Sequence, residues 1–288
     1  MAITELQRQK RAQHIGSSDA AAILGLDPYK TPGDVLLAKT GQVEEFEGNE
    51  RTWIGTQLEP ALRAMAAERL GCKVVAPTAT YVHSAGLLAA NIDGQIEKAA
   101  RGQPIVEIKT TGNAAEWGEP GSDDVPDRII IQVHHQMICS DAKEAHVVRL
   151  LADRGLKFDV YHIRRDDAMA EEMIDYLSLW WGKYIVNGDP LPPASAPSLD
   201  VAKRRAREPG KCVQLDPALV KVWRDANEKF KEAKEAEETA KAAVVAALSD
   251  AEIGEIPGMG IVTYTQSSRK GYTVADTTYR TLRFKESR

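Results

Sequence analysis

Two strand segments bring acidic residues and a lysine within reach of one another. In "VEIKTT" (106–111), strand alternation puts Glu107 and Lys109 on one face and the apolar residues between them on the other. If the preceding chain turns back near 100–101, Asp93 lies opposite Glu107, and such partners are about 4.5–5.5 Å apart at Cα. Two carboxylates at that distance repel each other unless a proton or a cation lies between them.

The residue types favour a hard divalent cation. Mg²⁺ and Mn²⁺ prefer carboxylate and carbonyl oxygens, so we expect Asp93, Glu107 and the backbone carbonyl of Ile108 as ligands. Lys109 lies on the same face, one strand repeat along, so that two acids and a lysine form a compact cup for the ion and a water molecule. The same spacing also fits an exposed hairpin with cross-strand charge pairs, and spacing alone does not separate these readings.

Two further features have both a functional and a structural interpretation. Glu59, in "IGTQLEP", is an acid on the helix before the sheet, and it is also placed for an i,i+4 pair with Arg63. Arg11, Ser17 and Ser18 surround an expected helix start, where free N–H groups bind anions. An ordinary helix cap by Ser17 or Ser18 explains the same pattern.

The elements that position these residues alternate between helices and strands. Apolar periodicity and Gly or Pro punctuation predict a mixed α/β (α+β) layer in which helices flank a mixed central sheet. We expect helices at 19–25, 32–41, 52–71, 127–140 and 167–188, and strands at 87–97, 103–111, 144–153 and 156–166.

The remainder of the chain reads as an appendage. Segment 189–211 is rich in Pro and Ser and then basic, which is typical of a linker between a core at 1–188 and an extension at 212–288. The extension is expected to hold a long helix at 217–248 and a hairpin at 260–276 that turns at "SSRKG". A stripe of apolar residues at coiled-coil spacing fits either packing on the chain's own body or pairing with a partner.

Composition excludes several classes of protein. The 288 residues carry a net charge of −5, which by itself does not indicate a nucleic-acid binder. A basic surface would have to come from local clusters of Lys and Arg. The three widely spaced cysteines suggest neither a disulfide framework nor a zinc site and fit a reducing cytoplasm. No apolar run has the length of a membrane span, and the polar N-terminus is not a signal peptide.

Five motifs in order resemble a known family. The motifs are "RAQHIGSSDAAAILGLDPYKTPGDVLLAKTG", "IGTQLEP", "ANIDG", "VEIKTT" and "IIIQVHHQM". Their order resembles that of the YqaJ-type phage recombination nucleases, relatives of phage lambda exonuclease within the PD-(D/E)xK nuclease superfamily. The resemblance covers roughly 1–185 and implies a PD-(D/E)xK core, with Gly16-Ser17-Ser18 a mild departure from the family pattern.

The resemblance also implies roles for individual residues. Asp93 and Glu107 resemble the metal ligands, Lys109 the catalytic lysine and Glu59 the acid near the metal ions, which are expected to be two Mg²⁺ or Mn²⁺. Arg11 and Ser18 resemble the pair that holds a terminal 5′-phosphate. Gln132 resembles the glutamine on the helix after the strand. Roles for His134, His135 and Gln136 stay open, either facing DNA or structural.

The activity implied is 5′→3′ hydrolysis of one strand of double-stranded DNA from a 5′-phosphorylated end, which leaves 3′ single-stranded tails for recombination. The family pattern further implies a trimeric ring, a single-strand annealing protein as partner and a place in the host cytoplasm. In such a ring, basic residues need only line the bore that holds DNA, while the outer surface keeps the acidic net charge. Two alternatives remain: a PD-(D/E)xK endonuclease and a non-catalytic module that binds DNA ends.

Overall fold

A computed structural model describes residues 12–43 and 48–268. The chain divides into two compact units, Met1–Pro209 and Gly210–Arg288. Within the described residues, no helix combines the length and the apolar character that crossing a membrane requires.

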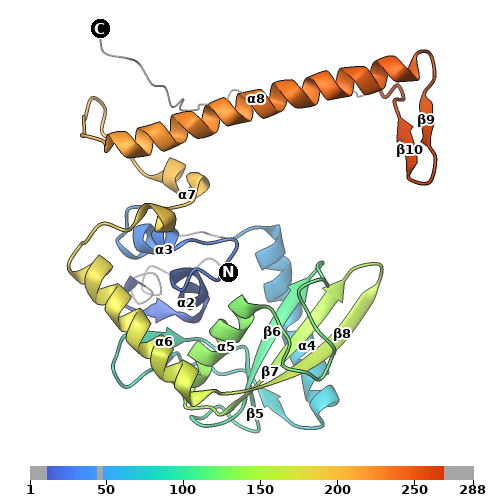
Figure 1. Cartoon of the computed structure of the whole chain (residues 1–288). Coiled ribbons are helices and arrows are strands. Elements are labelled where there is room, and N and C mark those ends of the chain that lie inside the picture. Colours follow the sequence, from blue (N-terminus) through green and yellow to red (C-terminus); the bar gives the residue numbers. More distant parts are fainter. Residues whose placement is uncertain (1–11, 44–47, 269–288) are drawn as a thin grey trace. The chain divides into compact units, whose positions relative to one another are not determined.

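A five-stranded sheet forms the centre of the first unit, in the order β2-β5-β6-β7-β8 (Figure 1). Strands β6 and β7 run parallel and the other neighbours run antiparallel, so the expected mixed sheet is confirmed. The strands are β2 (Val74–Val75), β5 (Gly94–Ile96), β6 (Ile105–Thr111), β7 (Glu144–Ala152) and β8 (Leu156–Arg164).

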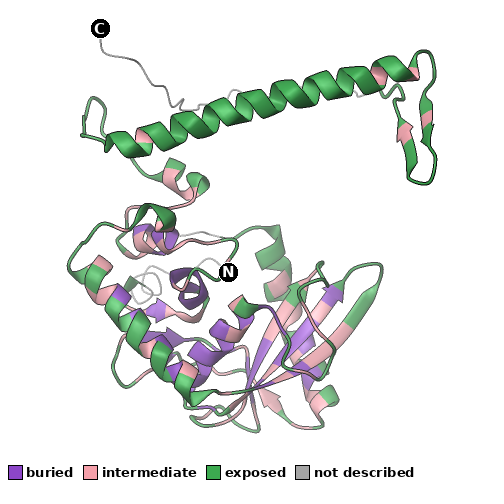
Figure 2. Cartoon of the chain, viewed as in Figure 1, coloured by how far each residue is buried: buried purple, intermediate pink, exposed green. Residues whose placement is uncertain are grey.

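Helices cover both faces of this sheet. Strand alternation sends Ile105 and Val147 to a face covered by α5 (Asp127–Ser140), against which α6 (Asp167–Trp180) packs. Val106 and Val148 point to the opposite face, where α4 (Glu50–Leu70) contributes Ala66. Buried residues therefore concentrate in the middle strands and in α5 (Figure 2). The helix predicted at 127–140 is confirmed at both ends.

A small second sheet supports the N-terminal helices. Strand β1 (Ile15–Gly16) pairs in parallel with β4 (Leu88–Ala90), whose other edge pairs with β3 (Tyr81–Val82). Helix α2 (Ser17–Ile23) begins directly after β1, and α3 (Pro32–Lys39) follows after a turn. Thr31 caps α3 by accepting a hydrogen bond from the Asp34 N–H at 3.1 Å, and this start was expected from the Thr-Pro pair.

The expectation of one strand at 87–97 was wrong. The chain breaks between β4 and β5, which belong to different sheets, and Asp93 stands at the break. The Asp93 Oδ2 accepts a hydrogen bond from the Ile108 N–H at 2.9 Å. In an uninterrupted strand pair, a backbone carbonyl would accept that hydrogen bond instead. Strand alternation does not reveal such a break, because Ala90, Ile92 and Ile96 stay an even number of residues apart across it.

Two helix ends also differ from expectation. Gly16, rather than Ser17 or Ser18, is the N-cap of α2, because the Asp19 carboxylate accepts the Gly16 N–H at 3.2 Å. The helix expected to run to Gly188 is α-helical only to Trp180 and continues as a π-helical stretch, η1 (Trp181–Val186).

The segment after α6 contacts the N-terminal helices. It contains a 3₁₀ turn, η2 (Pro193–Ser195), and a short helix, α7 (Leu199–Arg204). The buried carboxylate of Asp34 accepts the Ser198 N–H at 2.8 Å and the Ser198 hydroxyl at 3.1 Å. The expected domain boundaries at 188 and 211 stay a prediction.

The second unit contains a long helix and a hairpin. Helix α8 (Pro217–Leu248) has the predicted bounds, and none of its residues is buried (Figure 2). The hairpin pairs β9 (Ile253–Ile256) with β10 (Gly260–Thr263). It therefore lies one strand earlier than expected, because 260–263 is its second strand. Most of the predicted turn at 267–271 and the whole predicted return strand lie outside the described residues.

Candidate active site

Glu107 is held from three directions on the α5 face of the sheet. Its side chain is only 3% exposed. One carboxylate oxygen, Oε1, accepts from Lys109 Nζ at 2.6 Å and from Gln132 Nε2 at 2.6 Å. The other, Oε2, accepts from Gln136 Nε2 at 2.6 Å. A buried carboxylate needs such partners, because removal from water penalises its charged form.

Gln132 connects the acid to the lysine. Its amide nitrogen donates to Glu107, and its amide oxygen accepts from Lys109 Nζ at 2.8 Å. Lys109 therefore has a defined position, while its side chain remains 27% exposed. An ammonium group that is fixed by two partners and still open to solvent is well placed to meet a phosphate.

Asp93 completes the group from the adjoining strand. The register of β5 and β6 pairs Gly94 with Val106, so one step further places Asp93 opposite Glu107 as the sequence predicted. Burial, followed by the negative charge of Glu107, raises the pKa of Asp93 from 3.8 to about 8. The Ile108 N–H and the Lys109 charge act in the other direction but do not cancel this rise.

Helix α4 reaches the site through Arg63. The Arg63 Nε donates to the Asp93 carbonyl oxygen at 2.6 Å, and its guanidinium also pairs with the Glu59 carboxylate. The i,i+4 pair that the sequence allowed is thus present. Glu59 is 35% exposed, and its negative charge contributes to the raised pKa of Asp93. The expected helix acid is therefore connected to the site through Arg63.

The donor set fits a hard divalent cation. Two carboxylates face each other, and burial, followed by the negative charge of Glu107, raises the pKa of Asp93, so a bound cation would stabilise the ionised pair. The buried Oε1 of Gln136 has no hydrogen-bond partner among the described residues, which leaves a further oxygen in the group. Asp93, Glu107 and the Ile108 carbonyl are the oxygens that would hold such an ion.

The start of α2 is described only in part. Ser17 is half-buried and Ser18 is exposed in the first helical turn, whereas Arg11 lies outside the described residues. Next to them, Asp19 is buried and pairs with Lys30 Nζ at 2.5 Å and Lys39 Nζ at 2.7 Å. Burial raises the pKa of Asp19, but the two lysine charges outweigh this effect and hold it below its usual range.

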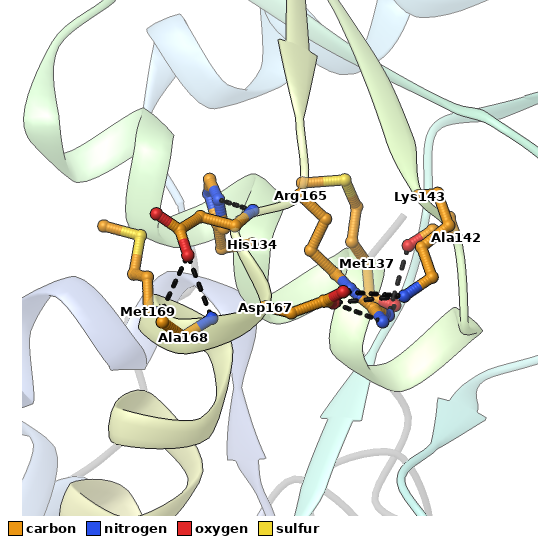
Figure 3. Close-up of polar contacts among 9 residues, drawn as sticks. His134, Met137, Ala142, Lys143, Arg165, Asp167, Ala168 and Met169 are labelled. Carbon is orange, nitrogen blue, oxygen red and sulfur yellow. Dashed lines mark hydrogen bonds and ion pairs between the residues drawn. The ribbon is translucent and has the colours of Figure 1, made fainter.

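His134 has a structural role. Its Nε2 accepts the Asp166 N–H at 3.2 Å, so the hydrogen lies on Nδ1, which donates to the Ile130 carbonyl at 2.9 Å. Burial lowers the pKa of His134, in agreement with a neutral ring. Figure 3 shows His134 close to the start of α6, where Arg165 also donates to the Met137 carbonyl at 3.5 Å. These contacts join α5 to α6.

His135 is fully buried on α5, and its Nδ1 lies 3.7 Å from Cys139 Sγ. Neither histidine of the 134–135 pair therefore contacts the acids. Gln136 does contact one of them, because it donates to Glu107, although the sequence leaves its role open. Its i,i+4 spacing from Gln132 was the available signal, because helix residues four apart share a face.

Part of the chain matches a known protein family and a relative of similar sequence. Residues 8–143 match the YqaJ-like viral recombinase domain family. The uncharacterized protein YqaJ of Bacillus subtilis (strain 168) is 33% identical over 199 residues, which cover 66% of this chain and 57% of that protein. This chain thus spans little more than half the length of that relative.

Solved structures share the fold. The alkaline exonuclease LHK-Exo from Laribacter hongkongensis matches with a TM-score of 0.51 and 21% identity, over 64% of this chain and 94% of that one. LHK-Exo in complex with dAMP matches with a TM-score of 0.52, at the same identity and coverage. The family resemblance inferred from the five motifs is confirmed: residues 8–143 match the YqaJ-like viral recombinase domain, within the fold of the alkaline exonucleases.

Proposed function

We propose that this protein is a divalent-metal-dependent deoxyribonuclease that digests double-stranded DNA from its ends in the 5′→3′ direction and leaves 3′ single-stranded tails. The observation that carries the proposal is the convergence of Asp93, Glu107 and Lys109 on one face of the sheet. The match to a recombinase domain and the alkaline exonuclease fold support the same reaction class.

In the proposed reaction the protein residues position the charges around the scissile phosphate. Asp93, Glu107 and the Ile108 carbonyl would hold Mg²⁺ or Mn²⁺, with two ions expected per site. When bound, the metal supplies Lewis-acid activation of water and of the phosphate. Lys109, held by Gln132, stabilises negative charge that develops on the phosphate oxygens. Glu59 contributes negative charge at the edge of the site.

The 5′-phosphate of the DNA end is proposed to bind beside α2. Ser17 and Ser18 contribute hydroxyl and backbone N–H donors, and Arg11 contributes a guanidinium that can bind phosphate with two parallel hydrogen bonds. This contact would set the polarity of digestion. An Arg11→Ala variant should lose its preference for 5′-phosphorylated over 5′-hydroxyl ends, and equal losses on both kinds of end would exclude this role.

The proposed partners follow from the family resemblance. They are duplex DNA with a 5′-phosphorylated end, two further copies of the chain in a ring, and a single-strand annealing protein that takes up the 3′ tail. The site of action would be the cytoplasm of a bacterial host. Measurement of the molar mass of the full chain in solution tests the trimer directly.

Digestion of an end-labelled linear duplex and of a covalently closed circle, each with and without Mg²⁺, tests the activity. The wild-type chain should release mononucleotides from the linear duplex only when Mg²⁺ is present. Asp93→Asn should abolish this release, while Asp153→Asn, a matched change at an exposed position, should preserve it.

The other outcomes distinguish the alternatives. Cutting of the closed circle would identify an endonuclease. Binding of DNA ends without digestion would identify a non-catalytic module. Unchanged digestion by Asp93→Asn would show that the assigned site is not the hydrolytic centre.

A further inference from the structure

A second group of metal-ligating side chains lies on the opposite face of the central sheet. Glu144 and His146 are two residues apart on β7 and therefore share a face. His162 on β8 is the direct cross-strand partner of His146. The same alternation places these three residues on the face of Val148, which packs beneath α4, and Glu107 on the other. The group is thus separate from the proposed hydrolytic centre.

The three side chains already converge. One potential ligand atom from each lies within 4.8 Å of those of the other two, and all three residues are half-buried. His162 Nε2 is 3.3 Å from Glu144 Oε2. The imidazole rings of His146 and His162 stack, with centroids 4.9 Å apart and planes inclined by 20°.

These distances suit a single small cation. Zn²⁺ binds imidazole nitrogen and carboxylate oxygen at about 2.0–2.2 Å, so two of its tetrahedral ligands are about 3.4 Å apart. The His162 to Glu144 distance already matches that spacing, and small side-chain rotations would bring the third ligand in. Two imidazoles and one carboxylate favour Zn²⁺ and similar late first-row ions over Mg²⁺, which prefers oxygen ligands.

Strand geometry explains why the group can act as one site. The sheet fixes the backbone of His146 directly against that of His162, so little main-chain order has to be created when an ion binds. The site joins the first residues of β7 to the last residues of β8. An ion there would cross-link β7 and β8 at the end of their ladder that lies far from the turn at 153–155.

We propose that Glu144, His146 and His162 form a binding site for one late first-row divalent cation, with Zn²⁺ as the best-fitting ion. Three protein ligands leave the fourth tetrahedral position to water. The site clamps β7 to β8 and is separate from the proposed hydrolytic centre.

The test titrates Zn²⁺ into the untagged full-length chain after treatment with chelator, followed by calorimetry, and repeats the titration with Co²⁺, followed by visible absorption. The wild-type chain should bind one equivalent with an intense tetrahedral Co²⁺ spectrum, and a large excess of Mg²⁺ should not displace it. Asp93→Asn, which alters the other centre, should retain this equivalent. His83→Ala, a half-buried histidine elsewhere, is the matched control and should also retain it.

His146→Ala and His162→Ala should weaken Zn²⁺ binding by at least about tenfold. His162→Gln can still hydrogen-bond to Glu144 but lacks the imidazole, so it should lose binding while the fold is preserved. Zn²⁺ should raise the thermal unfolding midpoint of the wild-type chain and of His83→Ala but not that of His162→Gln. Full-affinity binding by a folded His162→Gln, displacement of the equivalent by Mg²⁺, or no Zn²⁺ binding by the wild-type chain would each overturn the proposal.

Discussion

The side chain of Gln132 hydrogen-bonds to both Glu107 and Lys109 and thereby fixes their relative positions. Replacement by Leu removes the donor to Glu107 Oε1 and the acceptor for Lys109 Nζ together. Loss of a supporting partner of this kind lowers metal affinity or activity by about 10–100-fold. We therefore expect Gln132→Leu to reduce the rate of Mg²⁺-dependent digestion by that factor at saturating DNA. Gln214→Leu, at an exposed position of the second unit, should leave the rate unchanged.

If the role of Gln132 were only to fill space, Gln132→Leu and Gln132→Met would both keep the wild-type rate. A reduced rate with an unchanged thermal unfolding midpoint supports the positioning role instead. Both the rate and the unfolding midpoint should be measured on the same preparation of each variant and compared with those of the wild-type chain.

His135 gives the fold a dependence on pH. Burial lowers its pKa from 6.5 to about 4, so the unfolded chain takes up a proton at a higher pH than the folded chain does. The stability contributed by neutral His135 is therefore complete above pH 6.5 and is lost as the pH falls toward 4. A shift of this size corresponds to about 3 kcal/mol.

Urea unfolding at pH 7.5 and pH 4.5 measures this effect, with wild type compared with His135→Leu. The wild-type free energy of unfolding should fall more steeply between the two pH values than that of the variant, and the difference in slope belongs to His135. Equal slopes would show that His135 is protonated in the folded state at the lower pH. The negative charge of Asp19 raises the pKa of His135, so the difference in slope includes the interaction between these two residues.

The sequence predicts the site residues that share one strand face better than it predicts the contacts that a distant helix makes with the site. Alternation and register place Glu107, Lys109 and Asp93 together before any coordinates are known. The Arg63 contact with the Asp93 carbonyl depends on how α4 crosses the sheet, and no local pattern encodes that crossing. Periodicity indicates which face of a helix is apolar, but not which strand it meets.

The segment after α6 packs tightly against α3. Gly33 lies so close to Pro197 that an added Cβ would be 2.3 Å from the Pro197 nitrogen. Gly33→Ala therefore forces the two segments apart, and overpacking of this kind costs about 1–3 kcal/mol. We expect a lower unfolding midpoint and faster cleavage by protease within 189–209.

Gly182→Ala is the matched control, because a Cβ there meets no atom within 4 Å. Its proteolysis pattern should match that of the wild-type chain. Should Gly33→Ala and Gly182→Ala be cleaved equally fast, the contact between α3 and the segment at 196–198 would not restrain that segment in solution.

Long, strongly periodic elements were predicted well, and their interruptions were not. The bounds of α5 and α8 follow from apolar period and capping residues, such as Asp216, whose side chain accepts from the N–H of Ala218. The break between β4 and β5 depends on a hydrogen bond between Asp93 and another strand. In the second unit, strand 260–263 pairs with the preceding strand, 253–256, through the turn at 257–259. The sequence pattern predicted pairing with the following segment instead.

At the scale of the whole molecule, the two units differ in what stabilises them. The hydrophobic clusters draw on residues between 15 and 185, all in the first unit. Helix α8 contributes no buried residue, and its apolar side chains Trp223, Phe230 and Val244 are 37%, 68% and 47% exposed. The folding free energy of the first unit therefore comes from its own core.

A chain that ends at Pro209 tests this division. Because both hydrophobic clusters and all the acids of the site remain, it should unfold cooperatively, with a midpoint within about 4 °C of that of the full chain, which corresponds to about 1 kcal/mol for a unit of this size. Its Asp93-dependent hydrolysis of a short duplex, per site and at saturating Mg²⁺, should persist. Calorimetry and end-labelled digestion measure the two quantities on the same preparation. Loss of cooperative unfolding would show that residues 210–288 complete the core, whereas cooperative unfolding without hydrolysis would assign them a direct part in the reaction.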